Sequence, residues 1–292
     1  MGARAVEEPN VRREAYVVRV RHIDLLRPDH AYFFGFAQTD GNHYAGRGQK
    51  GRLSIELSDR DDAVLHSFCS LFDVHSRVSY RERTTNFGVH RSATWTVCNL
   101  GFRRELAELG LPAGRKSETV APPLSAFSTR DYLRGLVDGD GSVGFTGTGR
   151  PFLAFTTASR ALADYFCAQA LSVAGAYRSV NANARDGVYN PMVSGEPAAV
   201  LAGWLYGDVG LALERKREAA ARVARWTRPT GMRARPHAGA RRWTAEEDAD
   251  VFNGSVREAA SRLGRSERSI SIRRFRLRGS AGSQHPNATS RS

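Results

Sequence analysis

Cysteine is scarce in this chain, and long apolar stretches are absent. The 292 residues include three cysteines, Cys69, Cys98 and Cys167, whose spacing fits neither a metal site nor a disulfide framework. We expect them to be small buried hydrophobic side chains in a reducing compartment. No apolar run approaches the ~18 residues of a membrane-spanning helix, and residues 1–14 lack the apolar core of a signal peptide. The sequence therefore predicts a cytoplasmic protein with no membrane partner.

Acidic residues are also fewer than basic residues. The chain has 30 acidic residues against 43 lysines and arginines, a formal net charge of +13 and a pI near 10.3. Such an excess indicates a polyanionic partner. A membrane surface is the other candidate, but no lysine-rich amphipathic helix stands out. Nucleic acid is therefore the expected partner, and the length allows one large or two ordinary domains.

What the sequence does contain is an internal repeat. Residues 32–41 and 132–141 both run from a tyrosine through a central glycine to an Asp-Gly step, 100 positions apart. Each copy carries an aspartate and, 76 positions later, a lysine: Asp40 with Lys116, and Asp140 with Lys216. A repeat of this length predicts two similar α/β units. It also places one carboxylate at the same point of each unit, as a symmetric metal site between the halves would require.

Both repeated segments are predicted to be helices that end at the Asp-Gly step. Asp29 is the expected N-cap of the first helix, and Ser128, with Asp131 three residues later, resembles a capping box for the second. Gly41 and Gly141 suit the left-handed conformation that ends a helix.

Each predicted helix also has a glycine in its middle, at Gly35 and Gly135. An interior helical glycine costs about 1 kcal/mol relative to alanine. Close packing of the two helices at these glycines explains that cost and brings the two aspartates together. Two other interpretations compete: Asp-Gly is a common turn dipeptide, and residues 138–140 could begin a calcium loop. The calcium loop fails, because Val143 and Gly149 occupy the places that need glycine and glutamate.

The paired segments resemble the motifs of LAGLIDADG homing endonucleases in their single-chain form. The second reads LRGLVDGDG at 133–141, with Arg134 as the main departure. The first, FFGFAQTDG at 33–41, departs at Phe34 and at Gln38, which stands in place of the earlier acid. The resemblance covers roughly residues 26–226. It implies an α+β fold in which two pseudo-symmetric αββαββα units, 26–124 and 125–226, form a saddle on double-stranded DNA after an N-terminal extension, 1–25.

The resemblance also implies the chemistry of the site. Asp40 and Asp140 would hold divalent cations, with Mg²⁺ expected because that ion takes oxygen ligands and retains waters. Lys116 and Lys216 would neutralise charge on the phosphates or polarise the attacking water; otherwise they are ordinary basic residues of a loop and a surface helix. Gly35 and Gly135 would form the domain interface of a monomer that needs no protein partner.

The strands that follow each motif are predicted to present polar faces to DNA. In the first half, an alternating run at 52–57 and a helix near 59–72 precede two further strands; in the second half, strands are expected near 142–147, 150–158, 177–184 and 188–194, with helices around 160–173 and 196–206. Arginine pairs with guanine edges and asparagine with adenine edges. The DNA-contacting side chains are expected to be Arg52, Arg77, Arg81, Arg83, Asn181, Asn183 and Arg185, unless these faces are merely solvated.

A separate module follows the repeats. Residues 227–241 have the composition of a basic flexible linker. Residues 242–279 show three capped helical segments in the order of a helix-turn-helix, whose last helix would enter the major groove. Its expected DNA-binding residues are Arg268, Arg273, Arg274 and Arg276; a basic helical hairpin without sequence recognition is the alternative. Residues 280–292 are expected to be disordered.

These observations predict a sequence-specific, metal-dependent DNA endonuclease of the homing type, acting at a long asymmetric site. We expect it to be bacterial or phage-encoded and associated with the nucleoid. The main alternative is a transcription regulator that keeps the fold and binds DNA without cutting, and an RNA maturase is a third possibility. An intein is disfavoured, because the chain begins Met1-Gly2 and lacks a terminal His-Asn.

Overall fold

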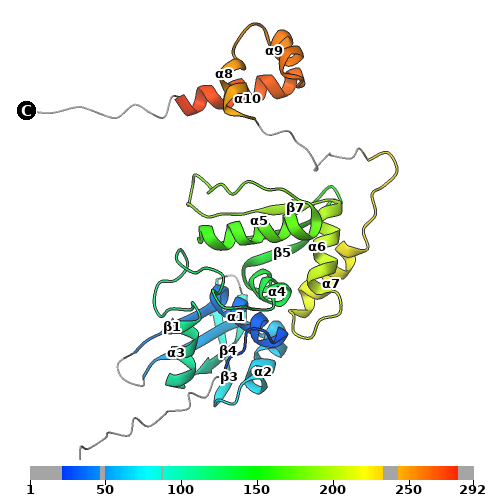
Figure 1. The fold of residues 1–292 in the computed structure, drawn as a ribbon. Helices are drawn as coiled ribbons and strands as arrows, with labels where there is room; N and C mark the ends of the chain where they lie inside the picture. Colours follow the sequence, from blue (N-terminus) through cyan, green and yellow to red (C-terminus); the bar gives the residue numbers. More distant parts are fainter. Residues whose placement is uncertain (1–21, 47–49, 87, 233–242, 282–292) are drawn as a thin grey trace, which may run out of the picture. The chain divides into compact units, whose positions relative to one another are not determined.

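The protein is an α+β chain that divides into two compact units, residues 1–233 and 234–292. The computed structural model describes residues 22–46, 50–86, 88–232 and 243–281 (Figure 1). The predicted N-terminal extension lies mostly outside the described residues, as do positions 282–292 of the predicted disordered tail and the side chain of Arg276.

The first half of the larger unit has the predicted αββαββα order. Its elements are α1 (Pro28–Asp40), β1 (Gly41–Tyr44), β2 (Arg52–Ser58), a short 3-10 helix η1 (Asp59–Asp61), α2 (Asp62–Leu71), β3 (Ser76–Thr85), β4 (Gly88–Val97) and α3 (Leu100–Glu108). The strands form one antiparallel sheet in the order β1-β2-β4-β3. One face of this sheet packs its buried side chains against helix residues, with Trp95 of β4 in edge contact with Phe33 of α1 and Phe68 of α2.

The second half departs from the prediction in its third strand. Its elements are α4 (Thr129–Asp140), β5 (Gly141–Phe145), β6 (Pro151–Phe155), α5 (Arg160–Ala174), β7 (Met192–Ser194), α6 (Glu196–Tyr206) and α7 (Glu214–Ala224). The sheet has three strands, in the order β5-β6-β7. The strand predicted at 177–184 is wrong: that stretch makes only an isolated bridge between Ala182 and Tyr189. Its apolar alternation is limited to Val180, Ala182 and Ala184. Val180 is half-buried and the two alanines are exposed, so the stretch buries little apolar surface.

Helices α1 and α4 pack side by side at the centre of the larger unit (Figure 1). A Cβ atom on Gly35 would lie 2.3 Å from the carbonyl oxygen of Tyr132, and one on Gly135 would lie 2.1 Å from that of Tyr32. These distances are far below contact, so the backbones touch where the glycines stand. The predicted helix interface at Gly35 and Gly135 is therefore present in the structure.

The ends of these two helices differ in part from the prediction. Gly41 and Gly141 have extended backbones, with φ of −74° and −105°, so the predicted left-handed caps are wrong. Glycine is needed there for space, because a Cβ would lie 2.3 Å from the oxygen of Ala37 and 2.6 Å from that of Val137. Asp29 is not the N-cap of α1 but lies in its first turn, paired with Arg27. Ser128 does precede α4, but its hydroxyl donates to the Asp131 carboxylate and does not cap the backbone.

The smaller unit contains the three predicted helices: α8 (Ala245–Asp250), α9 (Val256–Leu263) and α10 (Glu267–Ala281). Capping boxes at Thr244 and Ser255 begin the first two, and Gly264 ends α9 in the left-handed conformation, with φ of 58°. Val251, Ala259, Ala260 and Ile270 form its small core. Arg228, within the predicted linker, pairs with Glu196 of the larger unit. That contact anchors the start of the stretch predicted to be flexible.

The three cysteines differ in their exposure. Cys167 is buried, but Cys69 is only half-buried and Cys98 is exposed, so the expectation of three buried thiols is wrong for Cys98. Within the described residues, no helix combines the length and apolar character that crossing a membrane would take.

Candidate active site

The two repeat aspartates occupy one site at the C-terminal ends of the paired helices. Asp40 and Asp140 are the last residues of α1 and α4. A Cβ on Gly139 would lie 3.5 Å from the Asp40 carboxylate, which places Asp40 against the neighbour of Asp140. Burial, and next the charge of Asp140, raise the pKa of Asp40 to about 6, while the two lysines and Arg215 act in the opposite sense. Burial also raises the pKa of Asp140. The carboxylates therefore repel each other in a partly desolvated place.

The two repeat lysines reach the same site from the ends of different elements. Lys116 lies in the segment between α3 and α4, and its Nζ donates to the carbonyl oxygens of Gln38, at 2.5 Å, and Thr39, at 3.0 Å. Lys216 lies in the first turn of α7, and its Nζ donates to Val137, Asp138 and Gly141 at 2.7–2.8 Å. Each ammonium thus binds carbonyl oxygens at or just after the C-terminal end of a motif helix, where the helix dipole favours positive charge.

This arrangement overturns the interpretation of the lysines as an ordinary loop residue and a surface helix residue. Lys116 and Lys216 are only 7% and 5% exposed. Burial lowers the pKa of each to about 8, against the favourable charges of the aspartates. Arg215, the neighbour of Lys216 in the chain, instead pairs with Asp61 of η1 at 2.9 Å and so joins the two halves.

The donor set at this site suits a hard divalent cation. Two carboxylates converge, and Mg²⁺ is commonly held by one or two carboxylates together with substrate phosphates and waters. Within the described part of the chain, no group of three or more His, Cys, Asp or Glu side chains could hold a metal. The described residues therefore contain no cluster of three or more cysteine or histidine side chains of the kind that binds zinc. Asp40 and Asp140 supply two carboxylates of the kind that such an ion takes.

Burial of Asp40, together with the nearby charge of Asp140, predicts a pH-dependent stability. Because the pKa of Asp40 is raised in the folded protein, its favourable contribution is fully present below pH 4 and is lost as the pH rises through about 6. In EDTA, Asp40→Asn should therefore unfold less readily than wild type at pH 7.5, by about 1–2 kcal/mol after allowance for solvent screening. The difference should shrink at pH 4.5. Urea unfolding at both pH values measures it, and equal stabilities at pH 7.5 would contradict the raised pKa of Asp40.

The predicted arginines of the first half do share one sheet face. Arg77 and Arg81 of β3 stand opposite Thr96 and Ser92 of β4, and Arg83 stands opposite His90. Arg52 of β2 lies on the same face, two residues from Ser54, which is the other partner of Thr96. All four arginines are exposed. The opposite face of the sheet holds buried side chains, namely Leu53 and Ile55 of β2 and Ala93, Trp95 and Val97 of β4. This exposed face is referred to below as the arginine face.

The equivalent face of the second sheet carries no charge on its strands. It consists of Ser142, Gly144, Phe152, Ala154, Met192 and Ser194. The predicted residues Asn181, Asn183 and Arg185 are exposed but lie outside any strand, so their expected common face is wrong. Asn183 accepts a hydrogen bond from the Arg185 backbone, and the Arg185 side chain pairs with Asp186 at 3.0 Å.

In the small module, two of the predicted DNA-binding arginines are occupied within the fold. Arg273 pairs with Asp248, and Arg274 donates to the carbonyl oxygens of Val251, at 2.7 Å, and Gly254, at 2.8 Å. They hold the end of α8 and the following turn against α10, so both guanidinium groups have partners within the small module, and DNA contact by these two arginines stays a prediction. Arg268 is exposed on α10, as predicted.

Sequence reasoning missed several buried residues near the site. Tyr32 and Tyr132 are fully buried and hydrogen-bond across the helix pair, and Asp138 is a buried acceptor. The 100-residue repeat could have identified the tyrosines, because both begin the repeated segment. Composition offered a further signal for the lysines: the chain has 40 arginines but only three lysines, and two of those are Lys116 and Lys216. The third, Lys50, is exposed.

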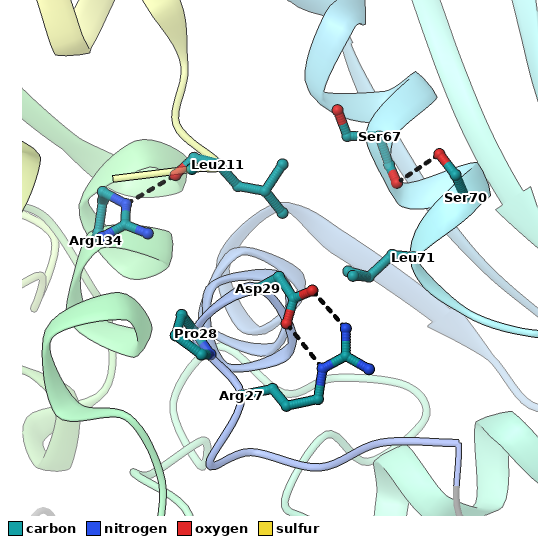
Figure 2. Close-up of a pocket in the computed structure, with 9 residues that line it drawn as sticks. Arg27, Pro28, Asp29, Ser67, Ser70, Leu71, Arg134 and Leu211 are labelled. Carbon is teal, nitrogen blue, oxygen red and sulfur yellow. Dashed lines mark hydrogen bonds and ion pairs between the residues drawn. The ribbon is translucent and has the colours of Figure 1, made fainter. Parts of the chain in front are cut away.

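A hollow in the described structure lies apart from this site. It measures about 610 Å³ and lies among Pro28, Leu71 and Leu211, beside the first turn of α1 (Figure 2). Pro28 and Asp40 begin and end a 13-residue helix, which separates them by roughly 18 Å at 1.5 Å per residue. The Arg27–Asp29 pair and the Arg134–Leu211 hydrogen bond at its edge are satisfied within the protein.

Comparison with known proteins identifies similar folds. No family model matches the chain, and no curated protein matches it. Solved structures that it resembles include LAGLIDADG homing endonucleases and a LAGLIDADG domain. The homing endonuclease I-WcaI bound to its DNA recognition sequence is 13% identical, with a TM-score of 0.48, and the match covers 67% of this chain and 87% of that one.

Two other solved structures resemble the chain to a similar extent. The I-LtrWI LAGLIDADG homing endonuclease bound to target DNA is 9% identical, with a TM-score of 0.41 and coverage of 68% and 90%. The N-terminal LAGLIDADG domain of DUF199/WhiA is 11% identical, with a TM-score of 0.42 and coverage of 69% and 99%. Identities this low indicate a similar fold and do not assign a function to this chain.

Proposed function

We propose that this protein is a divalent-metal-dependent endonuclease that cuts both strands of a specific DNA site. The observation that carries the proposal is the convergence of Asp40 and Asp140 at the paired helix ends, each with a buried lysine of its own half. Two equivalent acid–lysine pairs on a pseudo-two-fold axis match a substrate with two antiparallel strands. The arginine face supplies a basic surface for that substrate.

In this proposal the chain's own residues have separate roles. Asp40 and Asp140 would hold Mg²⁺, which supplies an acidified water and stabilisation of the phosphate oxygens when bound. Lys116 and Lys216 offset the negative charge that gathers where carboxylates and phosphates meet. Because each Nζ is held by backbone carbonyls, the charge is fixed in place before DNA arrives. Paired glycines keep the two carboxylates at a constant separation.

The proposal is tested by cleavage of DNA with the purified full chain. A plasmid library of randomised inserts, incubated with the protein and Mg²⁺, should yield linear molecules cut at one recurring sequence. Substitution of EDTA for Mg²⁺ should abolish the cuts. Selective binding of a sequence with no cutting under any divalent ion would instead favour a DNA-binding regulator, the alternative with which the appended three-helix module is also compatible.

The arginine face predicts how DNA affinity depends on salt. Removing one side chain that neutralises a phosphate lowers the slope of log affinity against log salt concentration by about one unit. Replacing Arg52, Arg77, Arg81 and Arg83 by glutamine should therefore flatten the slope by up to about three to four units. Glutamine at Arg178 and Arg185 of the second half is the control. For each arginine removed it should change the slope less, since Arg185 is paired with Asp186 at 3.0 Å and Arg178 donates to the Met192 carbonyl at 2.7 Å. Fluorescence anisotropy at a series of salt concentrations provides the slopes, and equal effects per arginine removed in the two sets would refute this assignment.

The smaller unit is proposed to raise affinity without taking part in cleavage. A chain ending at Arg233 keeps the first compact unit and removes 12 arginines and six acids. It should bind DNA more weakly, with a flatter salt dependence, because a tethered second binding module raises the effective concentration at the site. At saturating enzyme it should still cut. Loss of cutting at saturation would mean that residues after 233 complete the catalytic unit.

A further inference from the structure

The residue two positions before each proposed metal-binding aspartate hydrogen-bonds to the segment that carries the lysine of the same half. In the first half this residue is Gln38. Its Nε2 donates to the carbonyl oxygen of Gly110 at 3.1 Å and to that of Ala121 at 3.0 Å. Lys116 lies between these two residues in the chain. One side-chain amide therefore closes the Lys116 segment at both of its ends.

Asp138 does the same for the second half with opposite chemistry. Its Oδ1 accepts from the hydroxyl of Tyr206 at 2.6 Å, and its Oδ2 accepts from the backbone N–H of Leu213 at 2.7 Å. Tyr206 ends α6, and Leu213 is the N-cap of α7, which carries Lys216 in its first turn. The carboxylate thus fixes both ends of the connection that delivers Lys216.

A tyrosine from the opposite helix completes each of these contacts. The Tyr132 hydroxyl, on α4, donates to Oε1 of Gln38 on α1 at 2.5 Å. The Tyr32 hydroxyl, on α1, donates to Oδ2 of Asp138 on α4 at 2.8 Å. All four side chains are at least 98% buried. The bonds therefore cross the helix pair in both directions without competition from solvent.

We propose that Gln38 and Asp138 are positioning residues for Lys116 and Lys216, and that each is oriented by the tyrosine of the other half, Tyr132 and Tyr32. Each lysine is then placed jointly by both repeats, which links the two half-sites through the helix interface. The consequence for cleavage rests on the proposed function, but the placement of the lysines does not.

The same contacts explain why the repeats differ at this position. Gln38 faces two carbonyl oxygens, which require N–H donors. Asp138 faces a backbone N–H and two hydroxyl donors, which require acceptors. With an amide at position 138, the side-chain NH₂ would face other hydrogen-bond donors. With a carboxylate at position 38, the carbonyl oxygens of Gly110 and Ala121 would have no donor. In both cases buried polar groups would lose their partners. The glutamine is therefore matched to its surroundings and is not a degenerate acid.

The small number of lysines allows the placement to be tested without any cleavage. Trace acetylation of the full chain with acetic anhydride, followed by peptide mass spectrometry, reports on Lys50, Lys116 and Lys216 separately. In wild type, the exposed Lys50 should react fastest, and the two buried lysines should be protected. Lys50 serves as the internal standard for reagent concentration in every variant.

The crossed hydrogen bonds predict a crossed pattern of reactivity. Tyr32→Phe, a change on the helix of Asp40, should speed acetylation of Lys216 by about fivefold and leave Lys116 unchanged; Tyr132→Phe should do the reverse. Tyr165→Phe is the matched control, because its ring contacts Tyr132 but its hydroxyl bonds only the Thr129 carbonyl. Gln38→Glu and Asp138→Asn should expose Lys116 and Lys216 respectively. Faster acetylation of the lysine that belongs to the same half as the changed tyrosine would overturn the proposal. Equally faster acetylation of both lysines would also overturn it.

Folding and function are separated by two further measurements. The thermal midpoint of each variant sets an assay temperature at which all of them are folded, and the tyrosine variants carry the test if Gln38→Glu does not fold. If the wild type cuts DNA, Asp138→Asn combined with Lys216→Met should be no slower than Lys216→Met alone, whereas independent roles would multiply the losses. If the wild type does not cut, the acetylation pattern still decides the placement, so failure of the nuclease proposal is distinguishable.

Discussion

Asp40→Asn and Asp140→Asn should each reduce double-strand cleavage by about a thousandfold or more while leaving DNA affinity within about threefold of wild type. Metal-assisted stabilisation of phosphate charge is worth several kcal/mol, and each 1.36 kcal/mol changes the rate tenfold. Neither aspartate belongs to the arginine face, so binding should persist. The measurements are single-turnover cutting of a selected target with saturating enzyme and Mg²⁺, and anisotropy titration of the same DNA.

The matched control for these variants is Asp73→Asn. Asp73 is an exposed carboxylate of the same unit and undergoes the same chemical change. It should cut at the wild-type rate. Wild-type cutting by the Asp40 and Asp140 double variant would show that these carboxylates are not the catalytic residues of the nuclease. A loss of binding in step with cutting would make them part of the fold and not of the chemistry.

Gly35→Ala and Gly135→Ala should each destabilise the larger unit by about 1–3 kcal/mol or more. A new Cβ would meet a backbone carbonyl oxygen of the partner helix at 2.3 or 2.1 Å, and a backbone atom cannot move aside as a side-chain end can. The helices would have to separate, which also moves both carboxylates. The sequence predicts a larger loss of activity than of stability for leucine at these positions. The structure predicts that a single methyl group already lowers the free energy of unfolding.

Gly203→Ala separates this packing effect from helix propensity. Gly203 is also a helical glycine, in α6, but a Cβ there would lie 3.5 Å from the Ala224 Cβ, an ordinary contact. Alanine should be neutral or stabilise the unit by up to about 1 kcal/mol. Urea unfolding of the three variants measures the contrast. A destabilisation at Gly203 as large as that at Gly35 would mean that alanine is disfavoured for a reason other than the helix interface.

Much of the fold could be predicted from the sequence because its elements follow local rules. The alternating run at 52–57 matches β2 closely, and the capping residues Ser255 and Ser266 bond the helix starts as expected. Where local rules are weak, the prediction fails. Residues 177–184 alternate only one valine and two small alanines with polar side chains, so the expected strand would bury little apolar surface, and the stretch makes only an isolated bridge.

The hydrogen-bond and ion-pair partners of individual side chains could not be predicted in the same way, because each partner lies at a distant position in the sequence. Arg273 and Arg274 have the sequence pattern of a DNA-reading helix, yet they bind Asp248 and the Val251 carbonyl across the small module. An arginine on a basic helix has the same local sequence signal whether it faces solvent or a folded neighbour. Only the packing of α8 against α10 decides between the two.

The sequence by itself determined the pairing of two equivalent halves. A 100-residue repeat that keeps a glycine, an Asp-Gly step and a lysine specifies two like units and the carboxylates that end their helices, since these features follow from spacing alone. The tertiary structure decided what surrounds those carboxylates. Tyr32 and Tyr132 bond across the interface, and the lysines turn inward to the helix ends, because buried polar groups must find partners and the available ones come from the other half of the chain.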